Sequence, residues 1–137
     1  MSAAFDLRIL ASDKLFFEGK ATSITVPAPD GAYTILPNHE NAIISVVSGM
    51  MRYRSEGGDV QETVVSSGFV EVFQNHVRLL IQTIERAEDI DVSRALRAKQ
   101  KAEEKLKQER SRREHLHAEA SLARALVRLQ AASHRKH

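Results

Sequence analysis

The distribution of glycine and proline divides this sequence into two unlike parts. All six glycines and all three prolines lie within the first 68 residues, and none follows Gly68. Both residues interrupt helices and build tight turns, so the first part favours short strands and the remainder favours long helices. The charge changes as well: residues 1–87 hold 7 Lys+Arg and 10 Asp+Glu, a net −3, whereas residues 88–137 hold 13 and 8, a net +5. We therefore predict two domains, 1–87 and 88–137.

The first domain is predicted to be a β-sandwich or a flattened barrel. Short apolar or alternating segments recur in it, and each is closed by turn residues such as Asp30-Gly31, Gly57-Gly58 or Gln74-Asn75. This pattern indicates about nine strands at the spacing typical of a sandwich, with no room for helices between them. Eight of these strands can be located, at residues 5–9, 22–26, 32–36, 42–47, 50–54, 61–65, 69–73 and 76–81.

The second domain is predicted to be helical. Asp91 is a suitable N-cap for a first helix, and Ser111 to Glu114 has the spacing of a capping box for a second one. The pattern permits either an antiparallel hairpin or one continuous helix of about 40 residues. The apolar stripe expected on the first helix contains Val92, Ala95, Leu96, Lys99, Ala102 and Leu106. The rows expected on the second contain Leu116, Ala120, Ala123 and Val127, and beside them Leu122, Leu126 and Leu129.

Several kinds of chemistry find no support in the sequence. There is no cysteine, which excludes disulfides and thiolate metal sites, and there is neither a phosphate-binding glycine loop nor a Gly-x-Ser-x-Gly nucleophile elbow. His115 and His117 point to different sides of a helix and cannot share a metal ion. No secretory signal and no apolar run of about 18 residues is present, so a soluble cytoplasmic protein is expected.

The segment Thr34 to Ile44 contains the histidine with the most conspicuous surroundings. An apolar run ends at Pro37, four polar residues include His39, and a second apolar run follows. Without a neighbouring cysteine, histidine or pair of carboxylates, His39 is a poor metal ligand or catalyst. A solvated turn residue and an interface contact remain open.

The positive charge of the second domain has two interpretations. Its Lys and Arg residues alternate with glutamates, which is typical of a solvated helix with surface ion pairs and gives no indication of nucleic-acid binding. Arg110, Arg112 and Arg113 form the densest cluster. They could mark the junction of two helices or a contact for an acidic surface.

Five motifs, taken in order, carry a resemblance that extends over nearly the whole chain. They are Ile35–His39, Gly49–Arg52, Ser66–Val72, Ile90–Ala95 and Ala98–Glu104. In sequence and spacing they resemble the epsilon subunit family of bacterial F-type ATP synthases, called delta in mitochondria. The resemblance implies an α+β fold with a ten-stranded antiparallel β-sandwich followed by a two-helix antiparallel hairpin.

The resemblance also implies a function and partners. The protein would be a non-catalytic subunit of the central stalk, peripheral on the cytoplasmic side of the bacterial inner membrane. It would bind the gamma subunit and the c-ring, rotate with them, and couple proton flow to ATP synthesis without a required cofactor or metal. The turn of Pro37, Asn38, His39 and Glu40 would face the c-ring and supply hydrogen bonds there.

For the hairpin, the resemblance implies regulation. In some members of the family it reaches the catalytic alpha and beta subunits and inhibits ATP hydrolysis, a contact for which Arg110, Arg112 and Arg113 are candidates here. In some members it binds ATP. The matching residues are Ile90, Asp91, Arg94 and Ala95, with Arg124 and Arg128 as candidate phosphate partners. An ATP-sensing module whose hairpin changes conformation is therefore the alternative function.

The chain departs from the family pattern at a few positions. Asn38 stands where the turn usually has glycine, and asparagine tolerates the left-handed conformation that such a turn needs. Glu40-Asn41 replaces the usual Ala-Pro, and Ala32 replaces a common carboxylate, so we expect Glu40 to serve the ring contact instead.

Overall fold

The computed structural model describes residues 3–12, 14–108 and 112–134. Its contacts divide the chain into two compact units, Met1–Arg86 and Ala87–His137, which are described separately below. None of the helices in the described ranges combines the length and the apolar character needed to cross a membrane.

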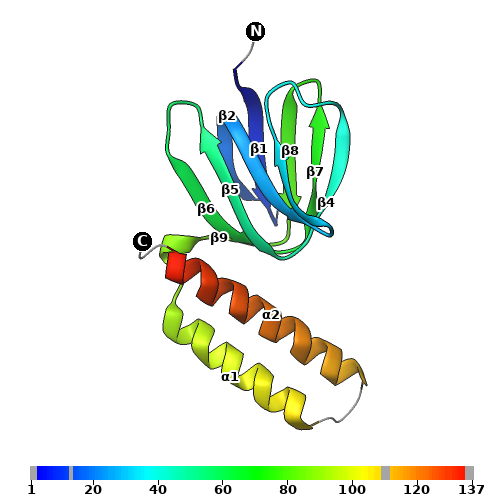
Figure 1. Ribbon diagram of the computed structural model, residues 1–137, viewed down its shortest axis with the longest axis vertical. Coiled ribbons are helices and arrows are strands. Elements are labelled where there is room, and N and C mark those ends of the chain that lie inside the picture. Colours follow the sequence, from blue (N-terminus) through cyan, green and yellow to red (C-terminus); the bar gives the residue numbers. More distant parts are fainter. Residues whose placement is uncertain (1–2, 13, 109–111, 135–137) are drawn as a thin grey trace. The chain divides into compact units, whose positions relative to one another are not determined.

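The first unit contains nine strands in its described residues, and Figure 1 shows them wrapped into a two-layered β-sandwich. The fold class predicted from the sequence is therefore confirmed. The strands are β1 (Phe5–Ala11), β2 (Lys14–Ala28), β3 (Gly31–Ile35), β4 (Ala42–Val46), β5 (Gly49–Ser55), β6 (Val60–Val65), β7 (Gly68–Phe73), β8 (His76–Ile81) and β9 (Ile84–Arg86).

The strands form a continuous hydrogen-bonded path in the order β4-β7-β8-β1-β2-β5-β6-β9, and β3 pairs with β2. The pairings are antiparallel, except that β1 lies parallel to β8. The 15-residue strand β2 joins the two layers because it pairs with β1 through its first half and with β3 and β5 through its second.

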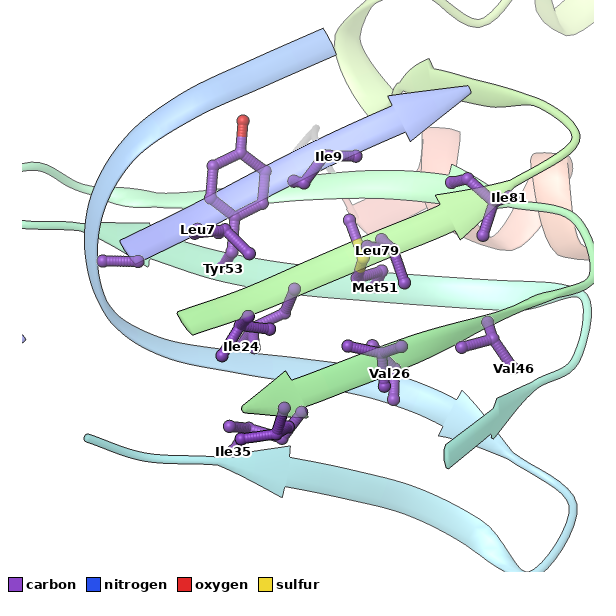
Figure 2. Packing of buried hydrophobic residues seen from close by; sticks show 14 of the residues in the cluster. Leu7, Ile9, Ile24, Val26, Ile35, Val46, Met51, Tyr53, Leu79 and Ile81 are labelled. Atoms are coloured by element: carbon purple, nitrogen blue, oxygen red, sulfur yellow. The ribbon is translucent and has the colours of Figure 1, made fainter. Parts of the chain in front are cut away.

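The core of the sandwich is made of large aliphatic and aromatic side chains from both layers (Figure 2). Alternate residues of each strand point inward, as a period of two requires. Burial of each such side chain stabilises the fold by about 1.5–3 kcal/mol. The largest fully buried side chains are Phe5, Leu7, Ile9, Ile24, Ile35, Met51 and Leu79.

Gly68 begins β7 at a place where no side chain fits. A Cβ atom there would meet the carbonyl oxygen of Leu80 and would lie 2.8 Å from the Cα of Ile81, both on the neighbouring strand β8. This close approach requires a glycine at the end of the Ser66-Ser67-Gly68 motif.

The second unit consists of a 3₁₀ turn η1 (Ala87–Asp89) and two helices, α1 (Val92–Gln108) and α2 (Arg112–His134). The helices lie side by side and run in opposite directions (Figure 1), so the hairpin and not the continuous helix is the observed state. The N-cap assigned to Asp91 is confirmed, since its Oδ1 accepts a hydrogen bond from the backbone N–H of Arg94 at 3.1 Å. The capping box proposed at Ser111 lies outside the described residues.

Alanines form the buried face of the hairpin. Ala95 and Ala102 on α1, and Ala118 and Ala125 on α2, are at most 3% exposed. Each pair is seven residues apart, the spacing that keeps one seam facing a partner helix. Small side chains at the seam allow the two backbones to approach closely.

The rows predicted for the second helix were wrong at four of their seven residues, whereas Leu122, Val127 and Leu129 are half-buried. Leu116 and Leu126 are 55% and 45% exposed, and Ala120 and Ala123 are exposed as well. The prediction followed the larger side chains, whereas close packing of two helices selects the row with the smallest ones. On α1, Leu96 is likewise 44% exposed although Ala95 and Ala102 were placed correctly.

Candidate functional site

The candidate site is the turn between β3 and β4, residues 36–41. Pro37 occupies the second position of a β-turn that begins at Leu36, and Asn38 occupies the third with a φ of 65°. The backbone N–H of His39 donates to the carbonyl oxygen of Leu36 at 3.3 Å. Proline followed by a residue with positive φ and a closing hydrogen bond is the pattern of a type II turn. Asn38 therefore adopts the conformation that glycine would otherwise supply.

The ring of His39 is bound within the turn region. Its Nε2 lies 2.8 Å from the Tyr33 hydroxyl, and its Nδ1 lies 2.7 Å from the backbone carbonyl oxygen of Glu40. A carbonyl oxygen only accepts, so Nδ1 carries the proton, and Nε2 of the neutral ring accepts from Tyr33. Both ring nitrogens are thus engaged inside the protein.

A metal centre finds no support at this turn. Among the described residues, no group of three or more His, Cys, Asp or Glu side chains is placed to hold a metal ion. The exposed residues of the turn are the apolar Leu36, which is 56% exposed, and the polar Asn38, Glu40 and Asn41. The arrangement suits a contact with another protein surface better than a chemical reaction.

A second turn supports the first one. The two residues between β7 and β8, Gln74 and Asn75, have φ values of 48° and 64°, as in a type I′ hairpin turn. Asn75 Oδ1 accepts from the backbone N–H of Asn38 at 2.7 Å, and the backbone N–H of Gln74 donates to Asn41 Oδ1 at 2.8 Å. The sequence marked both turns but not their association, because no local pattern reports a contact between residues 37 positions apart.

The outer face of the sheet carries side chains in rows that follow the strand register. One row joins Phe69, Leu80, Leu10 and Leu15 across β7, β8, β1 and β2. An open groove of about 440 Å³ lies along part of it and is lined by Leu10, Ser12, Ser67, Gly68, Phe69, Leu80, Ile81 and Gln82. Exposed apolar surface of this kind is typical of a site of protein–protein contact.

The next rows of that face are charged. Arg78 binds Glu71 with its Nη2 3.0 Å from Oε1. Asp6 lies between Lys20, whose Nζ is 2.6 Å from its Oδ1, and His76, whose Nδ1 is 2.9 Å from its Oδ2. The hydrogen bond from Lys20 holds the pKa of Asp6 below its ordinary value.

The residues predicted to bind ATP lie in the hairpin. Ile90 and Ala95 are buried at 4% and 3% exposure, Arg94 is exposed, and Asp91 caps α1. On α2, the Arg124 guanidinium donates to the Ser121 hydroxyl at 3.0 Å, and Arg128 is half-buried. The antiparallel arrangement brings the start of α1 and the end of α2 to the same end of the hairpin (Figure 1). Within this set, Asp91 accepts hydrogen bonds from the backbone N–H groups of Arg94 and Ala95. ATP binding by the six residues stays a prediction.

The residues predicted to make the inhibitory contact lie mostly outside the described part of the chain. Arg110 is not among the described residues, and for Arg112 and Arg113 only their place at the start of α2 is described.

Comparison with protein families covers both units. Residues 4–87 match the family described as the ATP synthase delta/epsilon chain, beta-sandwich domain, and residues 88–133 match its long alpha-helix domain. The chain belongs to the delta/epsilon family of ATP synthase subunits. It is accordingly a non-catalytic, central-stalk subunit, as the resemblance in its motifs predicted.

Individual relatives agree with this assignment. The chain is 36% identical over 134 residues to the ATP synthase epsilon chain of Ruminiclostridium cellulolyticum, which covers 98% of this chain and 99% of that one. It is 39% identical over 115 residues to the epsilon chain of Symbiobacterium thermophilum, covering 84% and 82%.

Solved structures show the same fold at low sequence identity. A chain of the Euglena gracilis mitochondrial ATP synthase, solved as OSCP/F1/c-ring, superposes with a TM-score of 0.83 at 22% identity, covering 100% of this chain and 84% of that chain. A chain of the Tetrahymena thermophila mitochondrial ATP synthase central stalk and c-ring gives 0.54 at 14% identity, covering 62% and 68%.

Proposed function

We propose that the β-sandwich couples rotation of the c-ring to the stalk, and that the turn at residues 36–41 is its contact with the ring. The observation that carries this proposal is the construction of the turn. Its backbone is closed by a hydrogen bond, its histidine is bound at both nitrogens, and a second turn holds it. A surface that transmits torque gains from such a fixed geometry, because a loose loop would move before it transmitted force.

The sandwich behind the turn provides stiffness. Its interior is filled by large side chains from both layers, and packed protein interiors have low compressibility. Force applied at one end of the strands is therefore carried along the hydrogen-bonded sheet.

The proposed ring interface consists of Pro37, Asn38, His39 and Glu40, and these residues have different roles in it. Pro37, Asn38 and His39 shape the turn, while Leu36 and the Glu40 carboxylate face outward. Glu40 would then bind polar or cationic groups of the ring loops.

Replacement of the outward groups tests this proposal. The double variant Leu36→Ser, Glu40→Ala is expected to reduce ATP-driven proton pumping by the membrane-bound synthase while ATP hydrolysis continues. The matched control is Glu56→Ala, which removes an exposed carboxylate from the turn between β5 and β6. Normal pumping per ATP hydrolysed in the double variant would reject the turn as the ring contact.

The gamma subunit is the proposed partner of the apolar row formed by Phe69, Leu80, Leu10 and Leu15. This row lies at the end of β7 and β8 opposite the turn of Gln74 and Asn75, so one strand pair would join the two partners. Phe69→Glu is expected to weaken co-purification with gamma. Ile43→Glu, at a side chain 74% exposed on the same sheet, is the control.

The hairpin is proposed to regulate hydrolysis by contact with the alpha and beta subunits. Its net positive charge, together with Arg110, Arg112 and Arg113 at the junction of the helices, supports an acidic binding partner. Replacing these three residues by glutamine should raise hydrolysis if they hold an inhibitory state. Unchanged hydrolysis would count against the contact.

ATP binding by the hairpin is a second proposal. It is supported by the resemblance of Ile90, Asp91, Arg94 and Ala95 to the family's ATP-binding motif, and by the antiparallel hairpin, which brings the start of α1 and the end of α2 to the same end (Figure 1). Calorimetric titration of the full chain with ATP, repeated with Arg94→Gln and Arg124→Gln, tests it. Binding that both variants leave unchanged would reject this site.

The proposed contacts with the c-ring and with gamma imply a location at the cytoplasmic face of the bacterial inner membrane, where the protein would be attached through the complex. Dissociation of the catalytic part from washed membranes should remove the chain with gamma.

A further inference from the structure

The turn at residues 36–41 is held by a side chain from a distant part of the sequence. We propose that Asn75 is a positioning residue that keeps this turn in the conformation that contacts the ring. The proposal rests on the function proposed above for the turn. It assigns to Asn75 a role that acts through Asn38 and involves no contact with the partner.

The hydrogen bonds of Asn75 join three segments of the chain. Its Oδ1 accepts from the backbone N–H of Asn38 at 2.7 Å, and its Nδ2 donates to the carbonyl oxygen of Ala4 at 3.0 Å. Its own carbonyl oxygen accepts from the backbone N–H of Asp6 at 3.2 Å. The orientation of the amide follows from chemistry, because only the oxygen accepts from an N–H and only the nitrogen donates to a carbonyl. The start of β1 thereby anchors the amide that holds the turn.

Asparagine meets two requirements at this position. The backbone φ of 64° is a conformation that glycine and asparagine tolerate best. Glycine would satisfy the backbone but would provide no group for Asn38 or Ala4. The side chain therefore adds a function to the turn that the hairpin itself does not need.

The two turns are joined at a second point. The backbone N–H of Gln74 donates to Asn41 Oδ1 at 2.8 Å, so neighbouring residues of the β7–β8 turn hold the middle and the end of the 36–41 turn. A surface ordered in advance pays less conformational entropy when a partner binds. Loss of the Asn75 clamp should therefore loosen the turn while β7 and β8 remain paired.

Three variants of the full chain separate the clamp from general stability. Asn75→Gly keeps the favourable backbone and removes both side-chain hydrogen bonds. Asn75→Asp keeps an oxygen acceptor for Asn38 and loses the donor to Ala4. Gln74→Gly is the matched control. It removes an exposed side chain from a residue of the same turn that also has a positive φ, and it leaves the backbone N–H that donates to Asn41.

Amide hydrogen exchange at Asn38 is the first measurement. Loss of one hydrogen bond predicts about tenfold faster exchange in Asn75→Gly, with wild-type exchange in Gln74→Gly and a value near wild type in Asn75→Asp. The melting temperature of the sandwich serves as a check for general destabilisation. Wild-type exchange in Asn75→Gly would overturn the proposal, since the turn would then hold itself.

Proton pumping per ATP hydrolysed is the second measurement, in the complete synthase carrying each variant. Reduced pumping in Asn75→Gly and its rescue in Asn75→Asp would support a positioning role. Faster exchange at Asn38 together with normal pumping would overturn that role. If the double variant Leu36→Ser, Glu40→Ala pumps normally, the ring contact itself fails, whereas the exchange rates still decide whether Asn75 positions the turn.

Discussion

In the β-sandwich most of the fully buried side chains are large, among them Phe5, Ile24 and Leu79, whereas in the hairpin the most buried side chains are alanines. Burial of a large aliphatic side chain contributes about 1.5–3 kcal/mol, and burial of one methyl group contributes about 0.8 kcal/mol. The sandwich therefore contains enough buried apolar surface to be stable as a separate unit. The hairpin depends on the close approach of its two helices. Because it buries less apolar surface per side chain, we expect separation of its helices to require less free energy than unfolding of the sandwich. This difference agrees with the coupling role proposed for the sandwich and the regulatory role proposed for the hairpin.

The largest expected effect comes from the sandwich core. Leu79→Ala removes a fully buried side chain of β8 and should lower the free energy of unfolding by about 2–5 kcal/mol. Chemical denaturation followed by circular dichroism measures it. Leu15→Ala, at a side chain 50% exposed on β2, is the control and should cost much less. Equal losses in both variants would show that the described core does not dominate stability.

A smaller effect is expected from overpacking the hairpin. Ala125 is 1% exposed, and Ala125→Leu should destabilise the helices by about 1–3 kcal/mol because the backbones are forced apart. Ala123→Leu adds the same atoms at an exposed position of α2. Loss of helical signal at lower temperature in the first variant only would confirm the alanine seam. If both variants behave alike, the seam is placed on the wrong face.

The N-cap of α1 should contribute about 1 kcal/mol. Asp91→Ala removes the acceptor for the Arg94 N–H and should lower the helical content near the start of α1. Asp91→Asn keeps an acceptor and should retain most of the stability, and Ser93→Ala serves as a neighbouring control. Helix stability is measured by hydrogen exchange at residues 94–98. Unchanged exchange in Asp91→Ala would disprove the cap.

The smallest effect concerns acid stability of the sandwich surface. The hydrogen bond from Lys20 makes the pKa of Asp6 lower in the folded protein than its ordinary value of 3.8. The stabilisation is therefore complete above that value and is lost as the pH falls through the lower, folded-state pKa. Because these side chains are about half exposed, the contribution is small.

Asp6→Asn should remove this pH dependence. The melting temperature measured from neutral pH downward is expected to fall less steeply below about pH 4 in the variant than in the wild type. Identical acid profiles would show that the Asp6–Lys20 pair contributes nothing in solution.

Most of the fold could be predicted because turn residues mark the ends of its strands. The first half of β2 was missed because charged residues and Gly19 interrupt its alternation of apolar and polar residues. Strand β9 was missed because it has only three residues. For the helices, the N-cap and the hairpin alternative could be read from local spacing. The buried face of α2 could not, because alanine gives no hydrophobic signal as strong as the exposed leucines beside it.

The candidate site was only half visible in the sequence. Pro37 and Asn38 indicate a turn by their own conformational preferences. The roles of Tyr33 and Asn75 depend on how β3 and the β7–β8 turn lie beside it, which a local pattern does not contain. His39 shows the consequence: its place in a motif indicates a contact residue, whereas its hydrogen bonds show how it fixes the turn.

The most direct test of the difference between the two units uses the complete synthase in membranes, with the full chain or with a chain that ends at Glu88. ATP hydrolysis and ATP-driven proton pumping are measured on the same preparation. If the sandwich couples and the hairpin regulates, the shortened chain will keep the pumping per ATP hydrolysed while hydrolysis rises several-fold. Loss of pumping per ATP hydrolysed, with the sandwich still bound to gamma, would contradict the assignment of coupling to the sandwich alone.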